Sequence, residues 1–380
     1  MQASVPQRIS ALPFALLLLL IALPTSAQVS RIEISSREQL AAEGVDYSYE
    51  RILGVMHFTL DPKDPDNSKV VDIRHAPVNG EGLVEYSADF KLLVPTANIA
   101  NGSLVYMVNN RGGGRVAPEI SLTDDPLSKM GFTWLLTGWI NELEAGANRI
   151  LLHAPIVGSA QQPITGDVRY EITTAQIEND VNISGAGHLS YEPTTAGARA
   201  ATLTTRLNLL DPRVPVERSQ FDLAVNWPQG RNQPVVTLNV DGGLRPGYVY
   251  ELIYEAMNPV LSGAGMAGIR DSMSLLLHGA ADDAALAPQL ASFNLPPLER
   301  SIAIGNSQSG RLLRLFLYDG FNQDLEGRRV FDGVIPVITG SGMGMFNNRF
   351  AMPTRTNGQH ENLLFPNDLF PFTYGDSTDP

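Results

Sequence analysis

Three short apolar runs place the strongest constraint on how this chain can fold. Residues 103–108, 132–139 and 301–304 are almost continuously apolar, with glycine, asparagine or charged residues close to their ends. Runs that do not alternate between apolar and polar side chains are typical of strands buried on both faces. Such a strand needs a layer of structure above and below it, so the runs predict a sheet covered by helices.

Segments with helical character lie near the later strands, at 265–277 and 307–317, and a further strand is expected at 330–338. Strands that alternate with helices predict an α/β fold with a mostly parallel sheet and helices on both faces. Two regions follow a different pattern. An N-terminal β region is expected over 28–97, and short alternating runs between proline, glycine and asparagine turns predict an antiparallel β insertion over 160–245.

The charge and the cysteine content exclude several functional classes. The chain has 380 residues, 27 basic and 40 acidic side chains, a net charge of −13 and no cysteine. Disulfide scaffolds, thiolate metal sites and cysteine nucleophiles are therefore excluded. An acidic chain is a poor partner for a phosphate backbone, so no nucleic-acid partner is expected. The sequence indicates no cofactor and no metal ion.

One glycine-rich segment imitates a dinucleotide site. Gly263–Gly268 has the G-x-G-x-x-G spacing and precedes a helical segment. In a dinucleotide site these glycines directly follow a strand, whereas here Met257-Asn258-Pro259 interrupts the approach. We therefore interpret these glycines as residues that allow close helix packing.

The first 27 residues have the pattern of a secretory signal peptide. Arg8 precedes an apolar run from Ala11 to Leu23, and small residues lead to Ala27, after which cleavage is expected. A membrane-spanning helix needs about 20 apolar residues, and this run is shorter, so an uncleaved anchor is the weaker alternative. The mature chain is expected to be periplasmic or secreted, with no stable membrane span.

The segment Ile304–Arg311 carries the clearest functional motif. It joins a predicted strand to a predicted helix, and Gly305 and Ser309 stand two residues before and after Ser307. A tight strand-to-helix turn needs small residues at those positions, and it exposes the apex hydroxyl as a nucleophile. Ser307 is therefore the predicted nucleophile. The alternatives are a serine that only caps the helix, and Ser309 as the nucleophile, which would put Arg311 where a small residue is needed.

Backbone N–H groups that could stabilise an oxyanion are expected at two places. In such a turn the residue after the nucleophile supplies one donor, which is Gln308 here. A second donor comes from a glycine-rich loop after an earlier strand, where the backbone can approach the substrate closely. Residues 110–114 follow the run at 103–108 and contain Arg111, Gly112 and two more glycines. A flexible turn is the alternative interpretation of this loop.

Several further motifs complete the pattern. They are Asn109–Gly112, Trp134–Trp139, Asp241–Gly247, Tyr250–Glu255, Gly268–Asp271, Ser307–Arg311, Phe331–Val334 and Phe370–Thr373. Together they resemble the α/β hydrolase domain family of bacterial exported proteins, over roughly residues 31–379. The resemblance implies one hydrolase domain over 28–380 and a serine hydrolase of the esterase type. Most members of that family are uncharacterised, so the substrate is left open among small-molecule, carbohydrate and lipid esters.

The partners of the nucleophile are the least defined part of the site. A serine nucleophile needs a base, usually histidine, and an acid that orients the base. His360 is the one histidine after Ser307, and only residues 339–380 follow the last predicted strand. The family resemblance implies that further strands follow. We therefore expect the chain to be incomplete at its C-terminus, with the base and the acid beyond residue 380 and His360 as the alternative base.

Two other functions compete with that of an esterase. A chain without a base would be a non-catalytic binding or scaffold protein on a hydrolase fold, with the β insertion as its interaction surface. An amidase or peptidase would use the same constellation as an esterase. The histidines before Ser307, at positions 57, 75, 153, 188 and 278, lack metal-ligand spacing and are expected to be structural.

Overall fold

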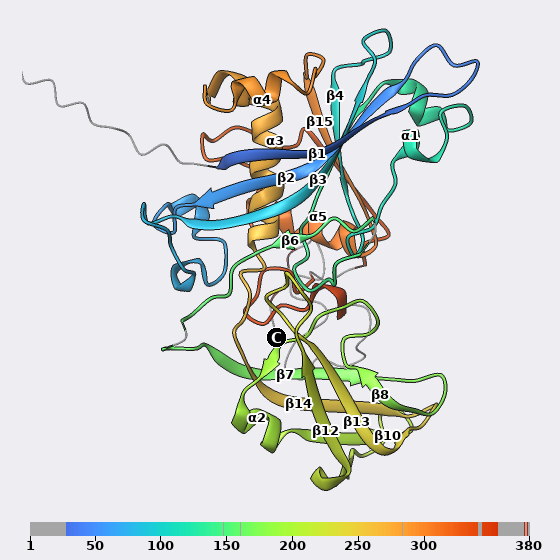
Figure 1. The fold of residues 1–380 in the computed structure, drawn as a ribbon, viewed down its shortest axis with the longest axis vertical. Helices are drawn as coiled ribbons and strands as arrows, with labels where there is room; N and C mark the ends of the chain where they lie inside the picture. The colour runs from blue at the N-terminus through green and yellow to red at the C-terminus, as the bar shows by residue number, and fades with distance from the viewer. Residues whose placement is uncertain are drawn as a thin grey trace, which may run out of the picture.

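The chain folds into two lobes that lie at opposite ends of its longest dimension (Figure 1). The first lobe contains the N-terminal strands and residues 300–337, and the second contains the green and yellow strands from the middle of the chain. The computed structural model describes residues 28–146, 148–159, 161–282, 284–340 and 344–355, together with Asp376 and Thr378. The predicted leader, residues 1–27, and His360 lie outside the described residues.

The sheet of the first lobe has eight strands and is mixed. Across the sheet the order is β1 (Val29–Leu40), β2 (Tyr49–Leu60), β3 (Val84–Pro95), β5 (Thr133–Thr137), β4 (Ser103–Val108), β15 (Arg300–Asn306) and β16 (Gly333–Val337), and β6 (Leu152–His153) pairs with β3. β5, β4, β15 and β16 run parallel to one another, whereas β1, β2 and β3 pair antiparallel. The prediction of a mostly parallel sheet is therefore correct for only part of it.

The predicted N-terminal β region belongs to this same sheet. β1 and β2 pair over almost their whole length, with Leu40 opposite Tyr49. The connection between them is shorter than the dozen or so residues that a parallel crossover needs, so the two strands have to be antiparallel. β3 then pairs with both β2 and β5, which joins the antiparallel part of the sheet to the parallel part.

The order of the strands reverses at β4. After β4 the chain forms β5 on one side of it, and β15 later takes the place on the other side, with β16 beyond. Gly305 of β15 lies level with Val108 of β4, so the residues that follow both strands leave the sheet at the same edge. In open α/β sheets ligands bind at the carboxyl ends of the strands, at such a reversal of order. The topology thus brings the segments after residues 108 and 306 to one place.

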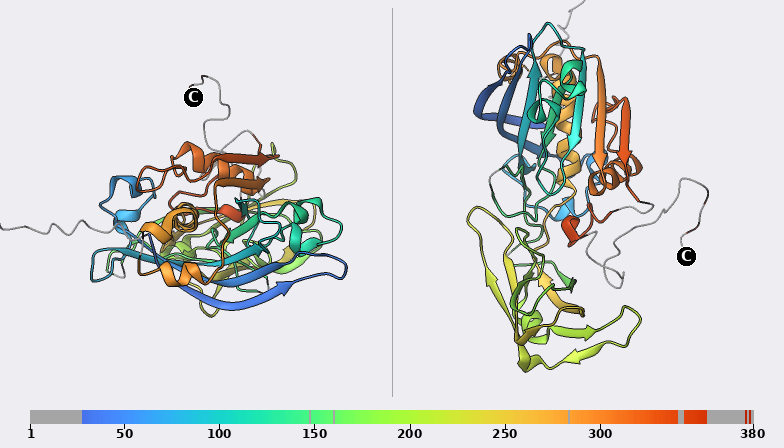
Figure 2. Two further views of the ribbon diagram at one scale, coloured as in Figure 1. Left: turned by 90° about the horizontal axis from the view of Figure 1, so that it is seen from above. Right: turned by 90° about the vertical axis from the view of Figure 1, so that its right-hand side faces the viewer.

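Three helices cover one face of this sheet, and the other face is covered more thinly (Figure 2). α3 (Ala264–Asp282), α4 (Ala287–Ala291) and α5 (Gln308–Tyr318) contribute side chains to the larger apolar core. On the opposite face, α1 (Ala117–Ile120) and its flanking loops enclose a smaller core. The prediction of helices on both faces therefore holds, but unevenly. Of the described helices, none is both long and apolar enough to cross a membrane.

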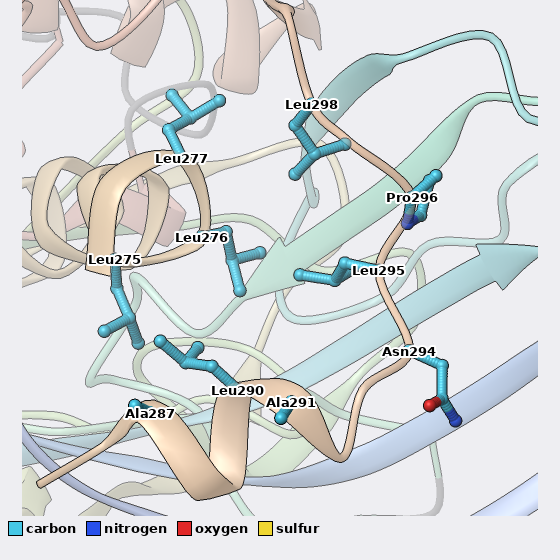
Figure 3. Close-up of a pocket in the computed structure, with 10 residues that line it drawn as sticks. All are labelled: Leu275, Leu276, Leu277, Ala287, Leu290, Ala291, Asn294, Leu295, Pro296 and Leu298. Atoms are coloured by element: carbon cyan, nitrogen blue, oxygen red, sulfur yellow. The ribbon is translucent and has the colours of Figure 1, made fainter. Parts of the chain in front are cut away.

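An apolar hollow separates the C-terminal half of α3 from α4 (Figure 3). It has a volume of about 310 Å³ and is lined by Leu275, Leu276 and Leu277 of α3, by residues of α4, and by the segment 294–298.

The other end of α3 packs directly on the backbone after β5. A Cβ atom at Gly265 would lie 2.4 Å from the carbonyl oxygen of Trp139, so this glycine of the G-x-G-x-x-G segment serves close packing.

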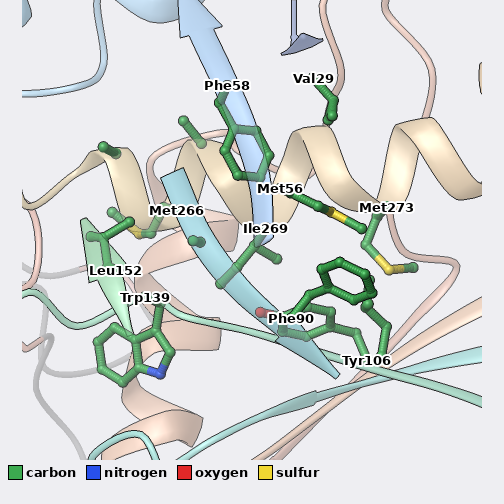
Figure 4. Close-up of a cluster of buried hydrophobic side chains, with 14 of the residues drawn as sticks. Val29, Met56, Phe58, Phe90, Tyr106, Trp139, Leu152, Met266, Ile269 and Met273 are labelled. Atoms are coloured by element: carbon green, nitrogen blue, oxygen red, sulfur yellow. The ribbon is translucent and has the colours of Figure 1, made fainter. Parts of the chain in front are cut away.

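Large side chains fill the space between the sheet and α3 (Figure 4). Met266, Ile269 and Met273 recur at helical spacing along α3 and belong to the core. Facing them, Phe58 of β2 stacks on Tyr86 of β3 with ring centroids 4.7 Å apart. This packing explains why 264–282 forms a long helix, since most helical stability in proteins comes from burying one face.

The second lobe is built from two antiparallel sheets that share one core. One has five strands, β7 (Thr165–Ile172), β9 (Glu192–Pro193), β10 (Thr202–Arg206), β11 (Val214–Val216) and β14 (Val249–Met257). The other has three, β8 (Glu178–Asn182), β12 (Phe221–Asn226) and β13 (Val235–Leu244), and α2 (Thr195–Ala200) contacts β14. Short 3-10 turns occur elsewhere, at Pro65–Asn67, Ile73–His75, Pro126–Met130, Arg218–Gln220 and Pro353–Arg355.

The paired strands of this lobe run past residue 245, the predicted end of the insertion. β14 pairs with β7 along its length, with Met257 opposite Thr165 and Tyr250 opposite Ile172. The apolar pattern of 248–254 therefore marks the central strand of the second lobe. Because that strand is covered on both sides, its sequence is apolar except at Glu251 and is similar to that of a strand of the first sheet.

A buried ion cluster crosses the five-stranded sheet. Arg169 donates from Nε to Oε2 of Glu251 over 2.6 Å, and Arg213 donates from Nε to Oε1 of the same carboxylate over 2.8 Å. Burial alone would raise the pKa of Glu251, but the hydrogen bonds from Arg213 and Arg169 outweigh it and hold the pKa below its ordinary value. A carboxyl group with a lowered pKa stabilises the fold while it is ionised and loses that contribution in acid.

We expect Glu251→Gln to lower the free energy of unfolding at pH 7 by about 2 kcal/mol, because it removes the charge of one of the two carboxylates, Glu251 and Glu171, that pair with the buried Arg169. The wild-type contribution is present above the ordinary carboxyl pKa and is lost as the pH falls through the lowered pKa. The variant should therefore lose less stability than wild type between about pH 5 and pH 3. Urea denaturation at several pH values measures both effects, with Glu81→Gln, at an exposed position, as the control. Equal acid sensitivity of Glu251→Gln and wild type would contradict this account.

Candidate functional site

Ser307 occupies the turn between β15 and α5 in an unusual backbone conformation. Its φ is 59° and its ψ is −116°, a combination that a residue with a side chain rarely adopts. Its N–H donates to the carbonyl oxygen of Val337 over 2.8 Å, which ties the turn to the end of β16. The Ser307 side chain makes no capping hydrogen bond to α5. The alternative of a serine that only caps the helix therefore lacks the bond that defines it.

Small residues are required on both sides of this turn. A Cβ atom at Gly305 would lie 2.4 Å from the carbonyl oxygen of Ser309, and one at Gly310 would lie 2.4 Å from Cγ2 of Thr339. Neither position has space for a methyl group, since backbone blocks it at Gly305 and the Thr339 side chain and the Gly305 carbonyl oxygen block it at Gly310. The crowding predicted from the sequence is thus observed at Gly305, and it is also found at Gly310.

Ser309 joins this turn to the loop after β4. Its side chain is fully buried, and Oγ lies 2.6 Å from Oδ1 of Asn110 and 3.1 Å from the carbonyl oxygen of Asn109. Its N–H also donates to Oδ1 of Asn110, over 3.2 Å. We call this contact the Ser309–Asn110 clamp. A hydroxyl that is buried and engaged in this way is poorly suited to act as the nucleophile, which favours Ser307 over Ser309.

The loop after β4 forms a tight, hydrogen-bonded turn. The N–H of Gly113 donates to the carbonyl oxygen of Asn110 over 2.9 Å, and the two residues between them, Arg111 and Gly112, have φ of 49° and 75°. Two central residues with positive φ are typical of a type I′ turn. Glycine suits position 112 because of its positive φ, and a Cβ atom there would also lie 3.2 Å from the carbonyl oxygen of Ile150.

Further hydrogen bonds fix the start of this loop at Asn109. The indole N–H of Trp139 donates to the carbonyl oxygen of Asn109 over 2.7 Å, and the Asn109 amide donates to the carbonyl oxygen of Thr137 over 2.8 Å. Asn109 is almost fully buried. These bonds fix the ends of β4 and β5 relative to each other, so the loop has a defined position beside Ser307.

The three backbone N–H groups expected to stabilise an oxyanion have no protein acceptor within the described ranges. They belong to Gln308, Arg111 and Gly112, and each donates no hydrogen bond there. The clamp brings the two segments that carry them together, because Ser309 follows Gln308 and Asn110 precedes Arg111. Free N–H groups at the start of a helix also favour negative charge.

Backbone strain is concentrated at this edge of the sheet. Apart from glycine, asparagine and aspartate, the described residues with positive φ are Arg111, Ser307, Ile338 and Phe350. Arg111, Ser307 and Ile338 follow β4, β15 and β16, and Phe350 lies in a segment that also contacts Gln308. Each such residue costs about 1–3 kcal/mol and persists only where the surroundings enforce it, which is common at functional sites.

A base for Ser307 is not found among the described histidines. The predicted alternative, His360, lies outside the described residues. The side chains of His57, His153 and His188 contact Arg31, Arg231 and the backbone of Ser184 respectively, and neither His75 nor His278 has a hydrogen bond to Ser307. In the part of the chain that the structure describes, no group of three or more His, Asp or Glu side chains could hold a metal ion.

The acids that follow Ser307 and are packed in the first lobe lie at the opposite edge of the sheet. Asp332 accepts from the N–H of Ser301 over 3.0 Å, and Ser301 precedes Ser307 by six residues of strand, or roughly 20 Å. Asp319 follows the far end of α5, roughly 17 Å from the turn. Asp324 and Glu326 both pair with Arg328. Asp332 and Asp319 are therefore too far from Ser307 to orient its base, and Asp324 and Glu326 are engaged by Arg328.

A pocket of about 670 Å³ lies behind the glycine-rich loop. Gly113 and Gly114 form part of its wall, and Arg51, Lys91 and Glu119 also line it. Lys91 donates to both Glu119 and the carbonyl oxygen of Gly114, so its charge is satisfied within the wall. Ser307 is not among the residues that line this pocket.

One comparison with known proteins gives a match. Residues 282–372 match the family model described as alpha/beta hydrolase domain, and this segment includes β15, Ser307, α5 and β16. Over this segment the match agrees with the α/β hydrolase resemblance predicted from the sequence, and it suggests hydrolase activity. Neither the curated proteins nor the solved structures contain a match to the chain.

We expect Ser309→Ala to lower the free energy of unfolding by about 1 kcal/mol, because Asn110 loses its shorter hydrogen bond. Hydrogen exchange in 109–114 should become faster, since the clamp no longer holds the loop. Urea denaturation and exchange mass spectrometry measure the two effects. Ser292→Ala, which removes an exposed hydroxyl that bonds Gln289, is the control. Unchanged exchange in the loop would mean that the clamp does not fix it.

Proposed function

We propose that this chain is an exported serine hydrolase that acts on carboxylic esters, with Ser307 as its nucleophile. The observation that carries the proposal is the conformation of Ser307. Ser307 is strained, with a positive φ, and its hydroxyl makes no hydrogen bond to any described residue. It lies at the edge of the sheet where the strand order reverses. The family match over 282–372 supports hydrolase chemistry. Export is proposed from the signal-peptide pattern of residues 1–27.

In the proposed reaction, Oγ of Ser307 attacks the ester carbonyl carbon while a base takes the hydroxyl proton. The carbonyl electron pair moves to oxygen, and the N–H groups of Gln308 and of Arg111 or Gly112 stabilise the oxyanion that forms. The carbonyl re-forms, the bond to the alcohol breaks, and the base returns its proton to the departing oxygen. Water then repeats the sequence on the acyl-enzyme and releases a carboxylic acid.

The base and the acid of this mechanism are proposed to lie outside the described residues. Asp319 and Asp332 lie too far from Ser307, Asp324 and Glu326 pair with Arg328, and none of the described histidines hydrogen-bonds to Ser307. His360 or a residue beyond 380 is left to supply the base. Such a residue has to come within hydrogen-bond reach of Oγ, about 2.6–3.2 Å in the reactive complex.

An ester of a small molecule, a carbohydrate or a lipid is the proposed substrate class. The same arrangement of groups can cleave amides, but an alcohol leaves more readily than an amine and demands less of the acid that protonates it. The net charge of −13 disfavours a strongly anionic substrate. For the same reason no nucleic-acid substrate is proposed.

A fluorophosphonate probe tests the nucleophile directly, because an activated serine oxygen attacks the phosphorus of the probe and displaces fluoride. In the full-length protein we expect one labelled peptide, residues 301–311, which trypsin releases by cleaving after Arg300 and after Arg311. Fragmentation of this peptide should locate the label on Ser307 rather than on Ser301 or Ser309. Ser307→Ala should abolish labelling, whereas the matched control Ser309→Ala should still be labelled.

Two outcomes would overturn the proposal. Labelling of Ser307→Ala to the same extent as wild type would mean that another residue reacts. No labelling of the full-length wild-type protein, together with no hydrolysis of nitrophenyl esters, would instead favour a non-catalytic binding or scaffold protein on this fold.

A further inference from the structure

A segment between the two lobes contacts both of them and also Gln308. We call residues 344–354 the strap. On the first lobe, Phe346 packs edge-on against Trp139 with ring centroids 5.3 Å apart, and the Asn347 amide donates to the carbonyl oxygen of Lys69 over 2.7 Å. On the second lobe, the strap packs against Tyr191. The strap therefore contacts both lobes directly.

The contact with the second lobe is specific. The hydroxyl of Tyr191 donates to the carbonyl oxygen of Ala351 over 2.5 Å, and its ring packs edge-on against Phe350 at 5.0 Å. Burial raises the pKa of Tyr191, so the hydroxyl stays protonated and can donate. Phe350 has a positive φ of 53°. Its ring packs on Gly166, since a Cβ atom at Gly166 would lie 2.9 Å from Cε2 of Phe350. Both lobes thus hold the strap in one strained conformation.

The other end of the strap is fastened beside Ser307. Nε2 of Gln308 donates to the carbonyl oxygen of Pro353 over 2.5 Å, and the Gln308 side chain is almost fully buried. The nitrogen of the Gln308 amide, and not its oxygen, has to face Pro353, because a carbonyl oxygen can only accept a hydrogen bond. One residue further, the N–H of Thr354 donates to the buried carboxylate of Glu142, which follows β5.

We propose that Gln308 is a positioning residue, whose side chain couples the second lobe to the oxyanion donors through the strap. This inference rests on the proposed function, since the backbone N–H of Gln308 is the proposed donor. A change in the second lobe shifts Ala351, then Pro353, and then the Gln308 side chain. The direction of the Gln308 N–H changes with it, and a displacement of about 1 Å in such a group can slow a reaction by two orders of magnitude.

Hydrogen exchange tests the coupling without any reaction. Tyr191→Phe removes only the hydroxyl that holds Ala351, and we expect faster exchange in residues 305–312, at the other end of the strap. Tyr49→Phe is the matched control, since it removes a buried hydroxyl that donates to the carbonyl oxygen of Ser128 over 3.0 Å, away from the strap. Unchanged exchange at 305–312 in Tyr191→Phe, or an equal increase in Tyr49→Phe, would overturn the coupling.

The rate of fluorophosphonate labelling tests the consequence for chemistry. We expect Gln308→Leu to slow labelling about 10- to 100-fold, and Tyr191→Phe to slow it about threefold to tenfold. The double variant should be no slower than Gln308→Leu alone, because both changes break one chain of contacts. Multiplied effects in the double variant, or a wild-type rate for Tyr191→Phe, would overturn the role of the strap.

The two tests also separate the failure of this inference from the failure of the proposed function. If wild type is not labelled, the proposed function is wrong, and the exchange experiment still decides whether the strap couples the second lobe to residues 305–312. If wild type is labelled at Ser307 but Tyr191→Phe changes neither exchange nor rate, the nucleophile stands and the coupling is wrong.

Discussion

The contact between Ser309 and Asn110 joins two turns that lie 199 residues apart in the chain. β4 and β15 bring these turns to one edge, but a shared edge alone would leave both loops free to move. The buried hydroxyl fixes the separation between the N–H of Gln308 and the N–H groups of Arg111 and Gly112. A preorganised set of donors stabilises developing charge without reorganising during the reaction. The strain at Ser307 is maintained in the same way, by close contacts at Gly305 and Gly310 that hold the turn in place.

The parts of the fold that neighbouring residues determine could be predicted from the sequence. The run at 103–108 forms β4, and the elbow segment forms the end of β15 and the start of α5. The need for a small residue at 305 follows from the geometry of the turn alone. The family match over 282–372 agrees with that interpretation. Local sequence specifies such elements because the constraint and the residue that meets it lie within a few positions of each other.

Features that depend on distant pairing could not be predicted in the same way. Residues 248–254 have the apolar pattern of a strand of the main sheet, yet β14 pairs with β7 in the second lobe. Periodicity describes how buried a strand is and carries no information about its partner. The role of Asn110 has no local signature, and the strap is irregular, so no repeating pattern marks it. The base and the acid also remain predictions, because His360 lies outside the described residues.

The antiparallel pairing of Thr165 with Met257 has a consequence for how this architecture can vary. The chain enters and leaves the second lobe through neighbouring positions, and the lobe has its own apolar core. Units that are joined through adjacent chain ends can be inserted, enlarged or exchanged with little disturbance to their host. Evolution could therefore remodel the surface beside the proposed nucleophile while the sheet that carries it stays constant. The strap would have to co-evolve with both, and so would Arg231 and Gln233 of the second lobe, which hydrogen-bond to Asn141.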